Sequence, residues 1–210
     1  AHVDTFARDH LPPPELQPEF LFTLPELQFP AQLNCATELL DARVAAGDGA
    51  RLCISAPGAP SWSYADLQAQ ANRIANVLVH DMGLVPGNRV LLSAPNCPML
   101  AAAWFGVIKA GGIAVATMPL LRAKELGPIL DKGQVTHALC DARLADELRA
   151  AAANAPQLQH IRYFNGGVAG ESLEAAMQGQ PASFSNVATA ADDTCILAFT
   201  SGTTGVPKGT

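Results

Sequence analysis

The chain has 210 residues, of which 49% are hydrophobic and 15% are charged, and its formal net charge is −6. This apolar content can bury a sizeable core and excludes general disorder. The acidic balance argues against a nucleic-acid partner, which requires a basic surface, but a local loop can still bind an anion such as phosphate.

No stretch has the character of a signal peptide or a membrane span. The first ten residues are mixed polar, and the longest apolar run, residues 99–108, is about half of the roughly 20 residues that a span needs. The 5 cysteines are scattered singly without C-x-x-C spacing. This pattern is typical of reduced core thiols and not of a disulfide framework or a zinc site. We therefore expect a cytoplasmic protein with no membrane span and no metal site of its own.

In chain order, residues 1–33 are expected to form an extended segment packed on the domain, with its leucine and aromatic side chains docked. The prolines between residues 10 and 30 forbid a long helix there. Asn34 is expected to cap a helix that runs to about residue 46. Ser63 and Asp66 resemble a capping box. The helix behind them has an apolar stripe at helical spacing, formed by Leu67, Ala71, Ile74, Ala75 and Leu78.

Strands and helices then alternate along the chain. The expected strands are 51–56, 89–94, 113–117, 136–140, 160–164 and 194–199, and the expected helices after the stripe are 98–109, 122–132, 142–154 and 171–177. This alternation of helices with apolar strands predicts an α/β fold with a mostly parallel sheet flanked by helices. We expect an α/β subdomain over 34–191 and a strand plus phosphate-binding loop over 192–210. In such sheets ligands collect at the carboxyl ends of the strands.

A glycine-rich loop, TSGTTGVPKG, occupies residues 200–209 after the last expected strand. Its glycines let the backbone approach a ligand closely, and its hydroxyls and lysine add hydrogen-bond donors. Such a loop suits a polyphosphate. It is not a Walker A loop, because Pro207 and Gly209 replace the second glycine and the Mg²⁺-binding hydroxyl of that motif. A phosphotransferase with a variant loop therefore stays a weaker alternative, as does a flexible linker.

Residues 200–209 resemble the signature phosphate loop of the adenylate-forming, or AMP-binding, superfamily, in its acyl- and aryl-CoA synthetase branch. Residues 61–76, 87–90 and 106–116 resemble further motifs of that superfamily, with Asn88 where the family has aspartate. Residues 2–41 and 118–122 resemble benzoate- and 2-aminobenzoate-CoA ligases. The resemblance thus implies the N-terminal subdomain portion of the adenylate-forming fold.

The resemblance also implies a reaction in which a carboxylate attacks the α-phosphate of Mg·ATP and the acyl group then passes to coenzyme A. ATP, Mg²⁺ and coenzyme A are the implied cofactors, and a small carboxylate is the implied substrate. The family's loop grips the β- and γ-phosphates, and this role is carried onto matching positions. These are Thr200, Ser201, Gly202, Thr203, Thr204, Gly205 and Lys208.

The family's other active-site residues follow this loop, so we expect an N-terminal fragment that contains no catalytic residue and is inactive alone. Lys109, at the end of an expected helix, is expected to be structural. Benzoate or 2-aminobenzoate is the expected type of acid. A medium- or long-chain acid and a non-catalytic interaction domain are the alternatives, and the sequence is compatible with a homodimer.

Overall fold

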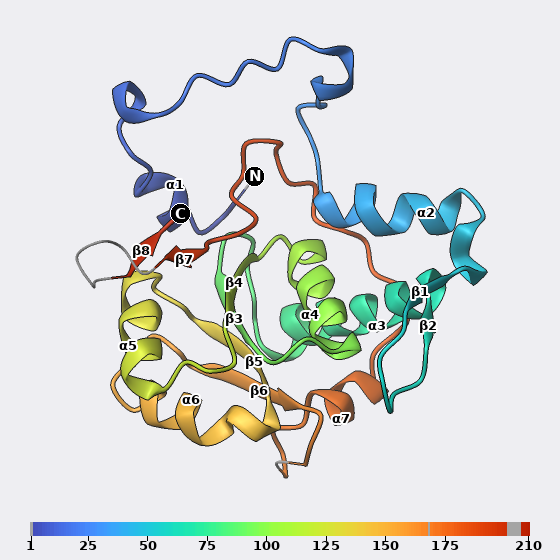
Figure 1. Ribbon diagram of the computed structural model, residues 1–210, viewed down its shortest axis with the longest axis vertical. Helices are drawn as coiled ribbons and strands as arrows, with labels where there is room; N and C mark the ends of the chain where they lie inside the picture. The colour runs from blue at the N-terminus through green and yellow to red at the C-terminus, as the bar shows by residue number, and fades with distance from the viewer. Residues whose placement is uncertain (1, 168, 201–206) are drawn as a thin grey trace.

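The computed structural model describes residues 2–167, 169–200 and 207–210 (Figure 1). Its centre is a parallel sheet of four strands in the order β4-β3-β5-β6. The strands are β3 (Arg89–Ser93), β4 (Ile113–Thr117), β5 (His137–Asp141) and β6 (His160–Phe164). Every residue of the two central strands, β3 and β5, is buried, as expected for a sheet covered on both faces. The expected α/β class is confirmed.

Helices cover both faces of this sheet (Figure 1). One face packs against α3 (Tyr64–Asn76), α4 (Pro98–Lys109) and α7 (Leu173–Gln178), and the other against α5 (Ala123–Lys132) and α6 (Ala145–Ala152). Side chains alternate between the two clusters, so Val90 and Leu92 face α3 and α4 while Leu91 faces α5 and α6. The alternation joins both cores to one sheet.

The capping box at the start of α3 is confirmed. The Ser63 hydroxyl accepts the Asp66 N–H at 3.1 Å, and the Asp66 carboxylate accepts the Ser63 N–H at 2.9 Å. The whole predicted apolar stripe is buried. α3 continues as a π-helical turn, Val77–Asp81. On α4, a Cβ added to Gly106 would come within 2.7 Å of Ile74 Cγ2, so this glycine permits the close contact of α3 with α4.

The remaining elements are short. A π-helical turn, Thr37–Asp41, leads into α2 (Ala42–Ala45), and the Asn34 side chain accepts the Ala36 N–H at 3.0 Å near its start. β1 (Leu52–Ile54) pairs with β2 (Trp62–Ser63), a strand that the sequence did not predict. The others are α1 (Phe6–Asp9), β7 (Phe199–Thr200), β8 (Lys208–Gly209) and 3₁₀ turns at 14–16, 25–27, 48–50 and 142–144. Among the described residues, no helix combines the length and apolarity that crossing a membrane requires.

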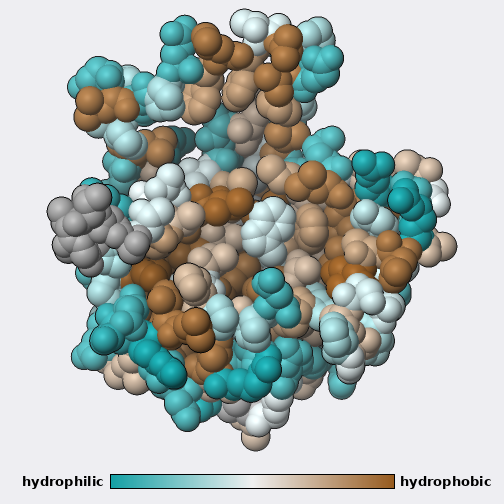
Figure 2. Space-filling view, in the orientation of Figure 1, coloured by the Kyte–Doolittle hydropathy of each residue, from teal (hydrophilic) through white to brown (hydrophobic). Residues whose placement is uncertain are grey.

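The prediction that the N-terminal leucine and aromatic side chains dock on the domain is wrong for residues 11–29. This segment arches away from the sheet, and Figure 2 shows hydrophobic side chains along the arch. Its prolines limit it to extended backbone and single 3₁₀ turns, whose hydrogen bonds are local. The exposed side chains are Leu11, Leu16, Phe20, Leu21, Phe22, Leu24 and Phe29.

Only part of the expected strand 194–199 joins the sheet. Ile196 forms one parallel bridge with Ala114 at the outer edge of β4. Ala198 then exchanges both of its backbone hydrogen bonds with Thr210, at 2.8 and 2.7 Å. Since those groups are committed to the later segment, the chain leaves β4 and forms the β7–β8 pair instead.

Candidate functional site

The β7–β8 pair brings the two ends of the predicted phosphate loop together. In its antiparallel register Thr200 lies opposite Lys208, and Phe199 lies opposite Gly209. Side chains that are directly opposite share one face of a strand pair, with Cβ atoms about 4.5–5.5 Å apart. Thr200 and Lys208 are both exposed. One hydroxyl and one ammonium are therefore presented together to solvent.

The other predicted phosphate ligands lie outside the described residues. These are Ser201, Gly202, Thr203, Thr204 and Gly205. Of the predicted set, the structure therefore places Thr200 and Lys208 alone.

A third residue, which the sequence did not indicate, holds the loop from another element. Lys132, the last residue of α5, donates from Nζ to the Pro207 carbonyl at 2.9 Å. This end of α5 leads into the amino end of β5, so the hairpin is not at the carboxyl ends of the strands, where we expected ligands. A helix carboxyl end carries partial negative charge. That charge disfavours an anion, and the positive charges of Lys132 and Lys208 beside the loop offset it.

The base of the hairpin is packed on the core. Leu197 and Phe199 contact the cluster beneath α5 and α6. A Cβ added to Gly209 would lie 3.0 Å from Leu197 Cδ1 and 3.5 Å from Phe199 Cζ. The glycine therefore allows these two apolar side chains to pack beneath the strand pair. This packing anchors the backbone that carries the exposed residues of the hairpin.

Lys109 is buried and lies in a structural network, in agreement with its expected role. Its Nζ donates to both carboxylate oxygens of Asp41, at 2.5 and 2.6 Å. Burial lowers the pKa of Lys109, and the Asp41 carboxylate offsets only part of this effect. Burial raises the pKa of Asp41, but hydrogen bonds from Lys109, Gln68 and Asn186 outweigh it and leave that pKa below its usual value. The network joins α4 to the α2 region and to the segment before β7.

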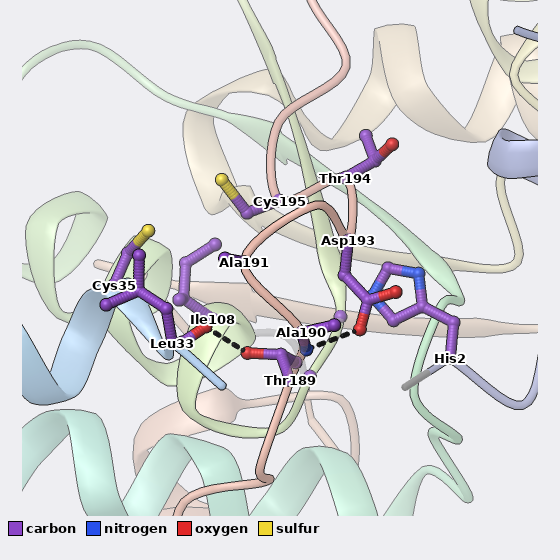
Figure 3. A pocket seen from close by; sticks show the side chains of 12 residues that line it. His2, Leu33, Cys35, Ile108, Thr189, Ala190, Ala191, Asp193, Thr194 and Cys195 are labelled. Atoms are coloured by element: carbon purple, nitrogen blue, oxygen red, sulfur yellow. Dashed lines mark hydrogen bonds between the residues drawn. The ribbon is translucent and has the colours of Figure 1, made fainter. Parts of the chain in front are cut away.

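A cavity of about 50 Å³ lies between the N-terminal residues, the end of α4 and the segment that leads to β7 (Figure 3). Its lining includes His2, Leu33, Cys35, Asp193 and Cys195. One water molecule needs about 10–15 Å³ of such space, whereas pockets that hold drug-sized ligands measure roughly 300–1,000 Å³. This cavity is smaller than a pocket for a nucleotide or an aromatic acid.

The fold and the site define an α/β chain with a candidate phosphate-binding hairpin on one side of a parallel sheet. The sequence matches the AMP-binding enzyme family over residues 41–210, and the chain belongs to that family. Benzoate–CoA ligase from Thauera aromatica is 28% identical over 188 residues, which cover 90% of this chain and 35% of the relative. Crotonobetaine/carnitine–CoA ligase from Salmonella paratyphi A is 35% identical over 156 residues, covering 70% of this chain and 30% of the relative.

Solved structures show the same fold. An anthranilate CoA ligase in complex with anthranoyl-AMP matches with a TM-score of 0.80 at 24% identity. The match covers 86% of this chain and 35% of the ligase chain. ATP-bound MatB from Rhodopseudomonas palustris matches with a TM-score of 0.73 at 29% identity, and the match covers 84% of this chain and 34% of the MatB chain. The chain thus spans about a third of the length of these relatives and has the fold of the N-terminal part of adenylate-forming enzymes.

Proposed function

We propose that the full-length protein is an ATP-dependent acid–CoA ligase and that this chain contributes its phosphate-binding hairpin. The observation that carries the proposal is the pairing of Thr200 with Lys208 across β7 and β8, within a segment that matches the AMP-binding family. Both side chains are exposed and can reach a bound ligand. A lysine ammonium has donors and no acceptor, so this pair suits a phosphate and not a metal ion.

In the proposed reaction, a carboxylate oxygen attacks the α-phosphorus of ATP and the bond to the β-phosphate oxygen breaks, which releases pyrophosphate. The thiol of coenzyme A then attacks the acyl carbonyl and AMP leaves. The carboxylate is a weak nucleophile and pyrophosphate is highly charged, so positioning and charge stabilisation dominate such a step. Magnesium bound to the ATP phosphates would add neutralising charge.

Thr200 and Lys208 would act on the leaving group. The Thr200 hydroxyl would donate to a phosphate oxygen, and Lys208 would add a mobile positive charge near the β- and γ-phosphates. Lys132 would act indirectly, because its bond to the Pro207 carbonyl holds the backbone just before Lys208. We assign the same phosphate contacts to Ser201, Gly202, Thr203, Thr204 and Gly205 as part of this proposal.

For the substrate, we propose an aromatic acid of the benzoate or 2-aminobenzoate type. The similarity to a benzoate–CoA ligase, 28% identical over 90% of the chain, supports this choice. A non-aromatic acid is the second candidate, favoured by the higher identity, over a shorter range, to crotonobetaine/carnitine–CoA ligase.

ATP–pyrophosphate exchange by the full-length protein tests the proposal. The acids to compare are benzoate, 2-aminobenzoate, cyclohexanecarboxylate and a fatty acid. We expect exchange that depends on an aromatic acid. Dependence on a fatty acid alone would contradict the aromatic substrate but keep the ligase, and a lack of exchange with any acid would contradict the ligase.

A further inference from the structure

Two segments far apart in the sequence run side by side ahead of the phosphate loop. Residues 31–33 pair with residues 189–191 in antiparallel fashion. The Leu33 N–H donates to the Thr189 carbonyl at 2.9 Å, and the Ala191 N–H donates to the Ala31 carbonyl at 3.0 Å. The Thr189 hydroxyl also donates to the Leu33 carbonyl at 2.7 Å. These bonds fix the backbone just ahead of one cysteine on each segment.

Those cysteines, Cys35 and Cys195, line the same small cavity (Figure 3). Figure 3 shows both sulfur atoms on the same side of the cavity, with no labelled side chain drawn between them. The Cys35 thiol is close enough to Cys195 to contribute, after burial, to raising the pKa of Cys195. Both are partly buried and both are free. The other three cysteines, Cys53, Cys97 and Cys140, are not among the residues that line this cavity.

We propose that Cys35 and Cys195 form an intramolecular disulfide when the protein reacts with a low-molecular-weight disulfide such as oxidised glutathione. The pair is therefore a redox modification site. One cysteine thiolate attacks a sulfur of oxidised glutathione, the glutathione S–S bond breaks, and one glutathione thiol leaves. The other cysteine then attacks the mixed disulfide, forms the Cys35–Cys195 bond and expels the second glutathione. The two protons and two electrons lost by the pair thus end on two glutathione thiols.

The order of the two attacks follows from the surroundings of Cys195. Burial and the neighbouring Cys35 thiol raise the pKa of Cys195 to about 11. Because the thiolate is the nucleophile, Cys195 is seldom ready to attack near neutral pH. Cys35 therefore attacks first and Cys195 closes the ring. The closing step should accelerate as the pH rises. While the pH stays well below the pKa of Cys195, each rise of one pH unit increases the thiolate fraction of this residue nearly tenfold.

The disulfide would act on the segment that leads into the phosphate loop. The Cys195 carbonyl accepts the Ala114 N–H at 2.9 Å at the edge of β4, and Thr200 follows a few residues later. A bond to Cys35 would restrict this segment relative to β4 and the helix after Asn34. An effect on ATP chemistry rests on the proposed function, whereas formation of the disulfide does not.

The experiment maps the linkage in the full-length protein. The reduced protein is incubated with oxidised glutathione at pH 8, blocked with N-ethylmaleimide and digested with trypsin without reduction. The sequence places Cys35 in peptide 9–43 and Cys195 in peptide 163–208, and neither peptide has another cysteine. We expect these two peptides to be linked in most molecules, and the linkage to form several-fold faster at pH 8 than at pH 7.

Cys53→Ser is the matched control and should leave the linkage unchanged. Cys195→Ser should leave Cys35 as a mixed disulfide with glutathione, and the same treatment in urea should abolish the preference for the 35–195 pair. In the oxidised wild type, backbone hydrogen exchange of residues 190–197 should slow. The proposal is wrong if Cys35 and Cys195 in the folded wild type are blocked separately, or if they link only between molecules. ATP–pyrophosphate exchange by the reduced protein is measured in a separate assay. If the disulfide does not form, the proposed function is therefore unaffected.

Discussion

Thr200 and Lys208 lie opposite each other in the antiparallel β7–β8 pair, with both side chains exposed. The pairing places a hydroxyl and an ammonium on one face of the hairpin, at the two ends of the glycine-rich loop. Lys132 ties the same hairpin to α5 through the Pro207 carbonyl. A phosphate group bound above the hairpin would therefore contact donors whose backbone is anchored on both the core and a helix.

Removal of the Lys208 charge is the first prediction. In the full-length protein, Lys208→Ala should lower the rate of adenylate formation on the order of a hundredfold, because loss of a preorganised charged donor weakens transition-state stabilisation. The measurement is ATP–pyrophosphate exchange at saturating carboxylate. Lys124→Ala is the control, because this lysine side chain is 83% exposed and forms a surface ion pair with Glu125. Equal rates for both variants would contradict the role of Lys208.

Lys132 should have a smaller and indirect effect. Lys132→Met keeps the aliphatic stem and removes the hydrogen bond to the Pro207 carbonyl, which contributes about 1 kcal/mol. We expect kcat/KM for ATP to fall roughly fivefold while the free energy of unfolding changes little, because the side chain is exposed. Steady-state kinetics and a urea titration check the two parts. A loss as large as that of Lys208→Ala would point to direct contact with ATP instead.

The buried pair of Lys109 and Asp41 predicts a loss of stability and not of chemistry. Lys109→Met leaves the Asp41 carboxylate without its cation, at a cost of about 3 kcal/mol in the free energy of unfolding. Adding Asp41→Asn should recover part of that loss, because it removes the unpaired charge. Urea denaturation measures both. A Lys109→Met protein that keeps its stability but loses pyrophosphate exchange would assign Lys109 to catalysis and overturn its structural role.

His137 predicts a dependence of stability on pH. Its ring packs on His160 at 4.8 Å and its Nε2 lies 3.0 Å from the Met82 carbonyl. Burial lowers the pKa of His137 to about 4. As the pH falls, the His137 ring therefore takes up a proton near pH 6.5 in the unfolded chain but only near pH 4 in the folded protein.

The contribution of His137 to the free energy of unfolding is thus fully present above pH 6.5. It is lost as the pH falls toward 4, and the loss is on the order of 3 kcal/mol. Urea denaturation at pH 7.5 and pH 5 should show the loss in the wild type and a smaller one in His137→Gln. The same pH dependence in both proteins would show that another group is responsible.

The sheet and its helices could be predicted because local signals and burial agree there. The capping box of Ser63 and Asp66 and the apolar stripe of α3 are short-range patterns, and the tertiary structure keeps both. The apolar strands β3 and β5 are buried on both faces, as continuous hydrophobic runs indicate.

The errors arose where partners far along the chain decide the structure. Leucine and phenylalanine in residues 11–29 suggested docking, but hydrophobicity alone does not supply a surface to bind, and the prolines limit the segment's backbone hydrogen bonds. Ala198 could have continued along β4, yet its backbone bonds go to Thr210. The contact of Lys132 with Pro207 joins two elements by a side chain and leaves no periodic signal.

Carboxylate-dependent ATP–pyrophosphate exchange by full-length wild type and Lys208→Ala is the most direct test of a phosphate-binding hairpin in an acid–CoA ligase. We predict exchange by the wild type with benzoate or 2-aminobenzoate, and a loss on the order of a hundredfold in the variant with its fold intact. Exchange at the wild-type rate in Lys208→Ala, or no exchange by the wild type with any carboxylate, would contradict the account.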